Sequence, residues 1–192
     1  MAARIQSSAI DIKIERLVKA DAGPVSAFTC GCDELDYFFH NEMFECVNNH
    51  YLSAYCAKSM NNDLLAIFTL ANDSIVLTDY EAKDDFILEA GCRINDTYLD
   101  IFNQQSMFPA VNIGHLGVLK DMQNKGIGSQ ILEFVIDTFK EFNVAGCQFI
   151  TVDALNTPQV KKFYAGRYFI RLTSSDEGQP TVRMYFTLGF LP

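Results

Sequence analysis

The sequence contains no apolar run of the roughly 20 residues that a membrane-spanning helix needs. Its opening stretch, MAARIQSSAIDIKIERL, also lacks a long apolar segment and is interrupted by Asp11, Lys13, Glu15 and Arg16. A secretory signal peptide requires such a segment, so none is expected. Together the two absences predict a cytoplasmic protein with no membrane partner.

The cysteines show no metal-binding pattern. All six are scattered, the closest pair is Cys30 and Cys32, and no C-x-x-C repeat or matching histidine pair sets up a zinc site. With no export signal, we expect reduced thiols that pack as small apolar residues, and no bound metal.

Charge is scarce and unevenly distributed. Charged residues make up 20% of the chain, and the net charge is −9. Residues 63–100 carry 2 basic and 9 acidic groups, whereas residues 101–192 carry 8 basic and 7 acidic groups. The acidic middle would repel nucleic acid and favour a cationic partner, although an acidic face that only aids solubility is an equal alternative.

Length and hydropathy patterns predict one mixed α/β domain over residues 1–192. We expect a largely antiparallel central sheet with flanking helices, in the order β-α-β-β-α-β-α-β-α-β-β. Alternating or continuous apolar runs predict strands, and apolar residues at three- and four-residue steps predict helices. The predicted strands span 10–18, 51–58, 64–70, 111–118, 147–154, 168–172 and 181–188. The predicted helices begin at Asp33, in 79–104, near Ile127 and at Pro158.

Residues 111–129, VNIGHLGVLKDMQNKGIGS, are the most informative stretch. An apolar strand leads into a glycine-bearing loop, and a strongly apolar helix pattern follows at once. Backbone N–H groups at a helix N-terminus lack intrahelical partners and favour an anion, so a phosphate-bearing ligand is expected here. The chain has no Gly-Lys-Ser/Thr of a Walker loop, and Ile131 stands where a dinucleotide fingerprint needs its third glycine.

The hexapeptide QNKGIG at 123–128 instead fits the Q/R-x-x-G-x-G/A pattern and resembles the pyrophosphate loop of the GNAT family of N-acetyltransferases. Its context supports the resemblance over roughly residues 108–170. A strand precedes the loop, a long apolar helix and a further strand follow, and Asn156 and Tyr164 come next. The strand order of the whole chain is also that of the family.

The resemblance implies acetyl-CoA as cosubstrate and an N-acetyltransferase activity. It implies that backbone N–H groups of the loop hold the pyrophosphate, that the strand residues before the loop pair with the pantetheine arm, and that Val118 N–H polarises the thioester carbonyl. Asn156 would contact the cofactor arm, or would be a plain N-cap of the helix at Pro158. The implied cofactor-binding residues are Leu116, Gly117, Val118, Gln123, Asn124, Lys125, Gly126, Ile127, Gly128, Ser129 and Asn156.

Tyr164 is the catalytic candidate, as the general acid that protonates the coenzyme A thiolate. Its alternative role is a core aromatic beside Phe163. The general base is not identified, because Asn112 occupies the slot in which many relatives carry Glu or His. His115 is near, but strand alternation places it on the opposite face, and we interpret it as a structural histidine.

The segment from Phe28 to Phe38, with Cys30, Gly31, Leu35 and Asp36, resembles the start of a GNAT subgroup that includes toxin acetyltransferases acting on aminoacyl-tRNA. The acidity favours a small cationic amine or a basic peptide as acceptor instead. Lys161, Lys162, Arg167 and Arg171 form only a thin basic stripe for tRNA. A non-catalytic acyl-CoA-binding module is a third alternative. The apolar end Gly189-Phe190-Leu191 could pair with another subunit in a homodimer.

Overall fold

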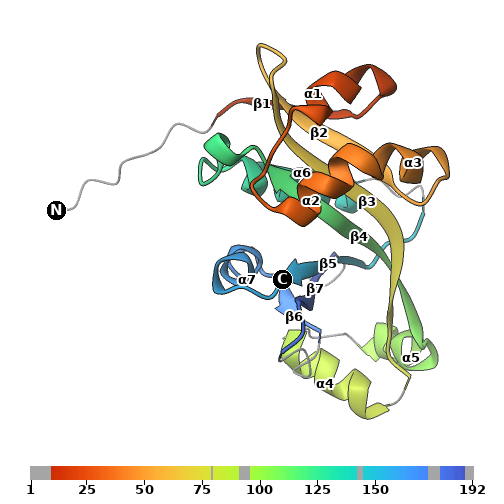
Figure 1. Cartoon of the computed structure of the whole chain (residues 1–192). Coiled ribbons are helices and arrows are strands. Elements are labelled where there is room, and N and C mark those ends of the chain that lie inside the picture. Colours follow the sequence, from red (N-terminus) through yellow and green to blue (C-terminus); the bar gives the residue numbers. More distant parts are fainter. Residues whose placement is uncertain (1–9, 79, 91–95, 142–144, 173–177, 189–192) are drawn as a thin grey trace. The chain divides into compact units, whose positions relative to one another are not determined.

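A computed structural model describes residues 10–78, 80–90, 96–141, 145–172 and 178–188 (Figure 1). Its strands form a mixed α/β fold with one seven-stranded open sheet in the order β1-β2-β3-β4-β5-β7-β6. The β1–β2, β2–β3, β5–β7 and β6–β7 pairs are antiparallel, and the β4–β5 pair is parallel. The predicted fold class and element order are therefore confirmed.

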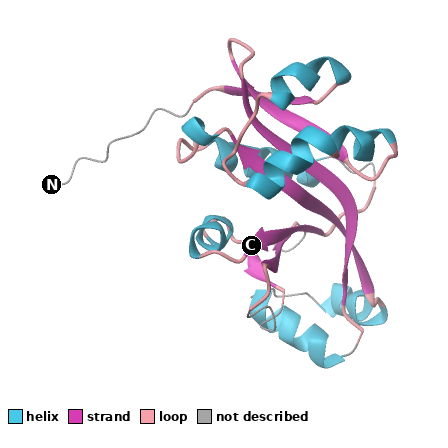
Figure 2. Ribbon diagram, in the orientation of Figure 1, coloured by secondary structure: helices cyan, strands magenta, loops and turns pink. Residues whose placement is uncertain are grey.

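Figure 2 distinguishes the helices from the strands by colour. The strands are β1 (Ile12–Arg16), β2 (Ser53–Ser59), β3 (Leu64–Val76), β4 (Met107–Val118), β5 (Phe149–Leu155), β6 (Ile170–Arg171) and β7 (Thr181–Thr187). The helices are η1 (Lys19–Asp21), α1 (Ala22–Ser26), α2 (Asp33–Asn41), α3 (Met43–Asn48), α4 (Tyr80–Ala90), α5 (Asp96–Gln104), η2 (Lys120–Met122), α6 (Ile127–Glu141) and α7 (Pro158–Ala165). None of the helices in these described ranges is long and apolar enough to cross a membrane.

Several predicted boundaries are wrong, and β4 begins at Met107 instead of at residue 111. The single helix expected from Asp33 is two helices, α2 and α3, separated at Glu42, whose φ is −118°. Strand β3 does not end at Leu70 but continues to Val76. The last strand pair is shorter than expected, because Tyr168 has a φ of +65° and β6 is only two residues long. The proposed pairing segment 189–191 lies outside the described residues.

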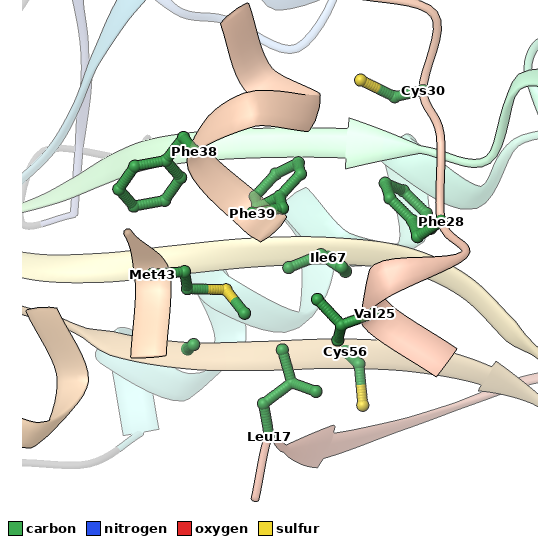
Figure 3. Packing of buried hydrophobic residues seen from close by; sticks show 10 residues of the cluster. Leu17, Val25, Phe28, Cys30, Phe38, Phe39, Met43, Cys56 and Ile67 are labelled. Carbon is green, nitrogen blue, oxygen red and sulfur yellow. The ribbon is translucent and has the colours of Figure 1, made fainter. Parts of the chain in front are cut away.

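The chain folds into two compact units, Met1–Ala71 with Gly114–Val135 and Asn72–Ile113 with Ile136–Pro192. In the first unit, adjacent residues of β3 face opposite sides of the sheet, as a strand requires. Ile67 belongs to the cluster under α1, α2 and α3, whereas Phe68 contacts Phe134 of α6. Figure 3 shows the first cluster, in which Phe39 meets Phe28 edge-to-face at a centroid distance of 5.8 Å.

The second unit has its own aromatic core. Phe86 of α4 and Phe102 of α5 pack with Phe108, Phe149 and Tyr185 of the sheet. On the opposite face of β7, Phe186 contacts Phe169, which follows α7. Tyr185 and Phe186 thus face opposite sides of the sheet and both sides are packed, which explains why apolar residues are adjacent here instead of alternating with polar ones.

Candidate functional site

The end of β4 presents main-chain groups on the side away from β3. The N–H of Leu119 donates to the carbonyl of Leu65 at 2.8 Å, and the N–H of His115 donates to Thr69 Oγ1 at 3.0 Å. Both acceptors belong to β3. Because successive N–H groups along a strand point to opposite sides, those of Leu116 and Val118 point away from β3. Two donors on one side of an extended segment suit pairing with an extended ligand.

The loop after β4 bends through two residues with left-handed backbone conformations. Asn124 has a φ of +60° and Gly126 a φ of +86°. Asparagine and glycine tolerate this region better than other residues, which accounts for the N-K-G sequence of the turn. No atom outside its own neighbours lies within 4 Å of the position that a Gly126 Cβ would occupy, so the backbone conformation, and not crowding, requires glycine there.

Helix α6 begins directly after this turn. The backbone N–H of Gln130 donates to the carbonyl of Gly126 at 3.1 Å and closes the first helical turn. The N–H groups of Ile127 and Gly128 therefore precede the intrahelical ladder, at the positive end of the helix dipole. Lys125 is exposed beside them. This part of the first unit has the main-chain geometry of an anion site.

Gly117 is the residue of β4 at which α2 packs closely against the strand. A Cβ at this position would be 2.7 Å from Phe39 Cε2 and 3.2 Å from Cys30 Cβ. Contacts of that length require a neighbour to move, so the packing of Phe39 requires glycine here. Sequence reasoning assigned Gly117 to the cofactor arm and missed this packing role.

His115 is engaged in packing. Its ring stacks on Phe38 with centroids 3.6 Å apart, and its Nδ1 lies 3.0 Å from Thr69 Oγ1. Burial lowers the pKa of His115 to about 4, so the imidazole is neutral near pH 7. These contacts agree with the interpretation of His115 as a structural histidine.

Asn112, in the second unit, leads to a polar network that sequence reasoning missed. Its Nδ2 donates to Thr151 Oγ1 at 3.1 Å, and that hydroxyl donates to Asp73 Oδ2. Asp73 also pairs with Arg183, which pairs in turn with Asp153 at 2.7 Å. The network joins β3, β4, β5 and β7. Its signal in the sequence is a charged residue inside each of three strands, Asp73 in β3, Asp153 in β5 and Arg183 in β7.

Asn156 does not cap α7. The cap is Thr157, whose Oγ1 accepts from the N–H of Val160 at 3.3 Å. The Asn156 side chain instead donates to the carbonyl of Gln179 at 2.9 Å and accepts from Lys161 Nζ at 2.7 Å. The N-cap alternative for Asn156 is wrong, because the chain turns into the helix one residue later.

Tyr164 lies on α7, with 5% of its surface exposed. Its ring meets those of Phe163 and Phe169 at centroid distances of 5.0 and 5.4 Å. Burial raises the pKa of the phenol above its ordinary value, so the group is protonated at neutral pH. The residue has both features that sequence reasoning considered, an aromatic packing role and a proton that it retains.

Comparison with known proteins supports one family. Residues 89–167 match the model of the Acetyltransferase (GNAT) family. No curated protein matches the chain. Among solved structures, a tyrosine-to-phenylalanine mutant of KacT is similar at 20% identity and a TM-score of 0.70, covering 92% of this chain and 95% of that one.

Two structures of AtaT are also similar. One, AtaTR bound with AcCoA, has 21% identity and a TM-score of 0.70, with 93% of this chain and 94% of that chain covered. The other, AtaT complexed with acetyl-methionyl-tRNAfMet, has 21% identity and a TM-score of 0.67, with 92% and 95% covered. At this identity the structures show a shared fold. The match to the Acetyltransferase (GNAT) family concerns residues 89–167, and the fold shared with these structures extends over more than nine-tenths of the chain.

Proposed function

We propose that the whole chain works as one N-acetyltransferase domain, which moves an acetyl group from acetyl-CoA to a primary amine by direct attack. The observation that carries this proposal is the main-chain geometry of residues 116–128. The N–H groups of Leu116 and Val118 point away from β3 at the end of β4. The loop that follows has two residues in left-handed conformations, and helix α6 begins directly after it.

In this proposal, the loop residues 123–129 bind the pyrophosphate through backbone N–H groups, and Lys125 adds positive charge. The Leu116–Val118 segment pairs with the pantetheine arm, and Asn156 contacts that arm. The Val118 N–H, which points away from β3, polarises the thioester carbonyl. The carbonyl of Val118 accepts from Gln123 Nε2 at 3.2 Å, which helps to fix the backbone conformation of the residue that carries this N–H.

The reaction then requires one proton to be transferred to the leaving thiolate and one proton to be lost by the attacking amine. The neutral amine attacks the thioester carbon and forms a tetrahedral intermediate, whose collapse breaks the carbon–sulfur bond. Tyr164 O–H donates its proton to the leaving coenzyme A thiolate, and the amine proton passes to water. Because Asn112 cannot accept a proton at neutral pH, we propose that an acceptor amine that is already neutral, or a water relay, replaces a protein base.

The charge distribution favours a small cationic amine or a basic peptide as acceptor. Three aspartates of the acidic stretch, Asp84, Asp85 and Asp100, are exposed on α4 and α5. Exposed carboxylates raise the local concentration of a cation and lower that of a polyanion.

A second candidate acceptor is the amino group of an aminoacyl-tRNA. The observation in its favour is the similarity over 92% of this chain to AtaT complexed with acetyl-methionyl-tRNAfMet. Both candidates use the same donor and the same nucleophile, a primary amine. They differ in the charge of the molecule that carries the amine, and therefore in salt dependence.

The test is release of coenzyme A from acetyl-CoA over a panel of polyamines, aminosugars, a Lys/Arg-rich peptide and charged tRNAs. We expect turnover with at least one amine. Turnover with a small amine or peptide supports the first acceptor class. Salt-sensitive turnover with aminoacyl-tRNA alone would replace it by the second. Tight binding of acetyl-CoA without turnover on any amine would contradict the proposal and indicate a non-catalytic acyl-CoA-binding module.

A further inference from the structure

Asp36 holds a short loop before α2 in a fixed shape. Its Oδ1 accepts from the backbone N–H of Cys30 at 2.8 Å, and its Oδ2 accepts from Thr29 Oγ1 at 2.5 Å. The N–H of Gly31 donates to Thr29 Oγ1 at 3.2 Å, and Gly31 itself has a φ of +78°. Burial alone raises the pKa of Asp36, but the hydrogen bonds from Thr29 and Cys30 outweigh it and hold this pKa below its ordinary value. The carboxylate is therefore ionised at neutral pH, and both of its oxygens accept hydrogen bonds from the loop.

The carbonyl groups of this same loop bind the segment that follows β4. The carbonyl of Thr29 accepts from the backbone N–H of Lys120 at 2.9 Å. The carbonyl of Cys30 accepts from Gln123 Nε2 at 2.7 Å. In addition, the aliphatic part of Lys120 lies 3.4 Å from the position that a Gly31 Cβ would occupy. The loop thus supports the donor segment at its beginning, at Lys120, and at the first residue of the proposed pyrophosphate loop, Gln123.

Gln123 connects three parts of the first unit. Its one amide group donates both to Cys30 O and to Val118 O. It therefore links the loop held by Asp36, the last residue of β4 and the start of the turn that leads to α6. The amide donor of Gln123 is therefore bound to the protein. We expect Gln123 to affect a bound ligand only indirectly, by holding the backbone of the loop in place.

We infer that Asp36 and Gln123 are positioning residues, which set the pyrophosphate loop for acetyl-CoA through the carbonyls of Thr29 and Cys30. The inference rests on the proposed function, because it needs acetyl-CoA to bind this loop. It gives the segment from Phe28 to Phe38 a physical role: the glycine and the aspartate of that segment shape a support for the donor loop. An anion site depends on several N–H groups converging, so a displaced loop loses binding without losing the fold.

The test measures the dissociation constants of two ligands by isothermal titration calorimetry. Acetyl-CoA carries the whole donor, and 3′-phosphoadenosine 5′-diphosphate carries the pyrophosphate without the pantetheine arm. We expect Asp36→Ala to weaken both ligands by about 10-fold, and Gln123→Met to do the same. Because both variants remove the same support, the double variant should also lose about 10-fold and not the roughly 100-fold of independent sites. Asp36→Asn, which keeps one acceptor oxygen, should recover part of the affinity.

Matched controls remove similar groups elsewhere. Asp33→Ala removes an exposed carboxylate from the same first turn of α2, and Gln105→Met removes an exposed amide after α5. Both should bind the two ligands within about twofold of the wild type. Gln123 is exposed, so its variant should fold even where Asp36→Ala does not.

Two results would overturn the inference. Variants that unfold at a lower temperature yet bind both ligands as tightly as the wild type would show that Asp36 and Gln123 stabilise the fold only. A wild-type protein that binds neither ligand would overturn the proposed function together with this inference, which separates the two failures.

Discussion

Tyr164 combines a buried ring with a hydroxyl that keeps its proton, and replacing it by phenylalanine separates the two properties. Tyr164→Phe keeps the contacts with Phe163 and Phe169 and removes only the proton donor. We expect kcat to fall by roughly 10²-fold or more, with the acetyl-CoA dissociation constant unchanged. The control is Tyr168→Phe, because Tyr168 is 81% exposed four residues later. Unchanged turnover in the Tyr164 variant would remove the general-acid role.

His115 gives the protein a pH-dependent contribution to stability. Burial lowers its pKa from 6.5 to about 4, so the folded state favours the neutral ring. The free energy of unfolding that His115 supplies is therefore complete above pH 6.5 and is lost as the pH falls toward 4. After allowance for its partial exposure, we expect a loss of about 1–2 kcal/mol.

Urea unfolding of the wild type and of His115→Gln, at pH 7.5 and at pH 4.5, measures this contribution. The two proteins differ at position 115 alone, so the effects that all other groups share cancel in the difference between them. The stability difference between the two proteins should shrink at the lower pH. A difference that is the same at both pH values would show that protonation of His115 is not what costs stability.

At the scale of elements, the approach of α2 to β4 depends on a single missing Cβ. Gly117→Ala would place a carbon 2.7 Å from the Phe39 ring, at the centre of the contact between the two elements. We expect a loss of about 1–3 kcal/mol in the free energy of unfolding. The control is Gly23→Ala in α1, where no atom lies within 4 Å of the new Cβ and the backbone is helical. Equal stabilities for the two variants would contradict the packing role of Gly117.

Local patterns predicted the elements well and their ends less well. The apolar spacing from Leu35 to Cys46 continues across the break at Glu42, because α2 and α3 pack on the same cluster. The spacing of apolar residues does not reveal a break in a helix when both parts bury their apolar sides against the same cluster. The capping residue of α7 is likewise ambiguous, since Asn156 and Thr157 are both good N-caps and only the backbone geometry selects Thr157.

At the scale of the whole molecule, the sequence could place the loop at 123–128 but not its supports. The hydrogen bond from Gln123 to Cys30 joins residues 93 positions apart, and the pair of Asp73 with Arg183 joins residues 110 positions apart. Such contacts arise from the order of the strands, which brings distant segments together, and leave no periodic trace in the sequence. The glycine loop was therefore predictable from a local motif, whereas the side chains that support it and the polar network beside Asn112 were not.

In the function proposed above, residues 116–128 hold acetyl-CoA, and calorimetric titration of acetyl-CoA into the unmodified protein tests this most directly. We expect saturable binding with one molecule per chain and a dissociation constant between about 1 μM and 1 mM, the range usual for enzyme substrates. Gly128→Asp adds a negative charge at the second residue of α6 and should abolish the binding heat while the protein stays folded. No saturable heat from the wild type at 1 mM acetyl-CoA (roughly the top of that range) would contradict the account.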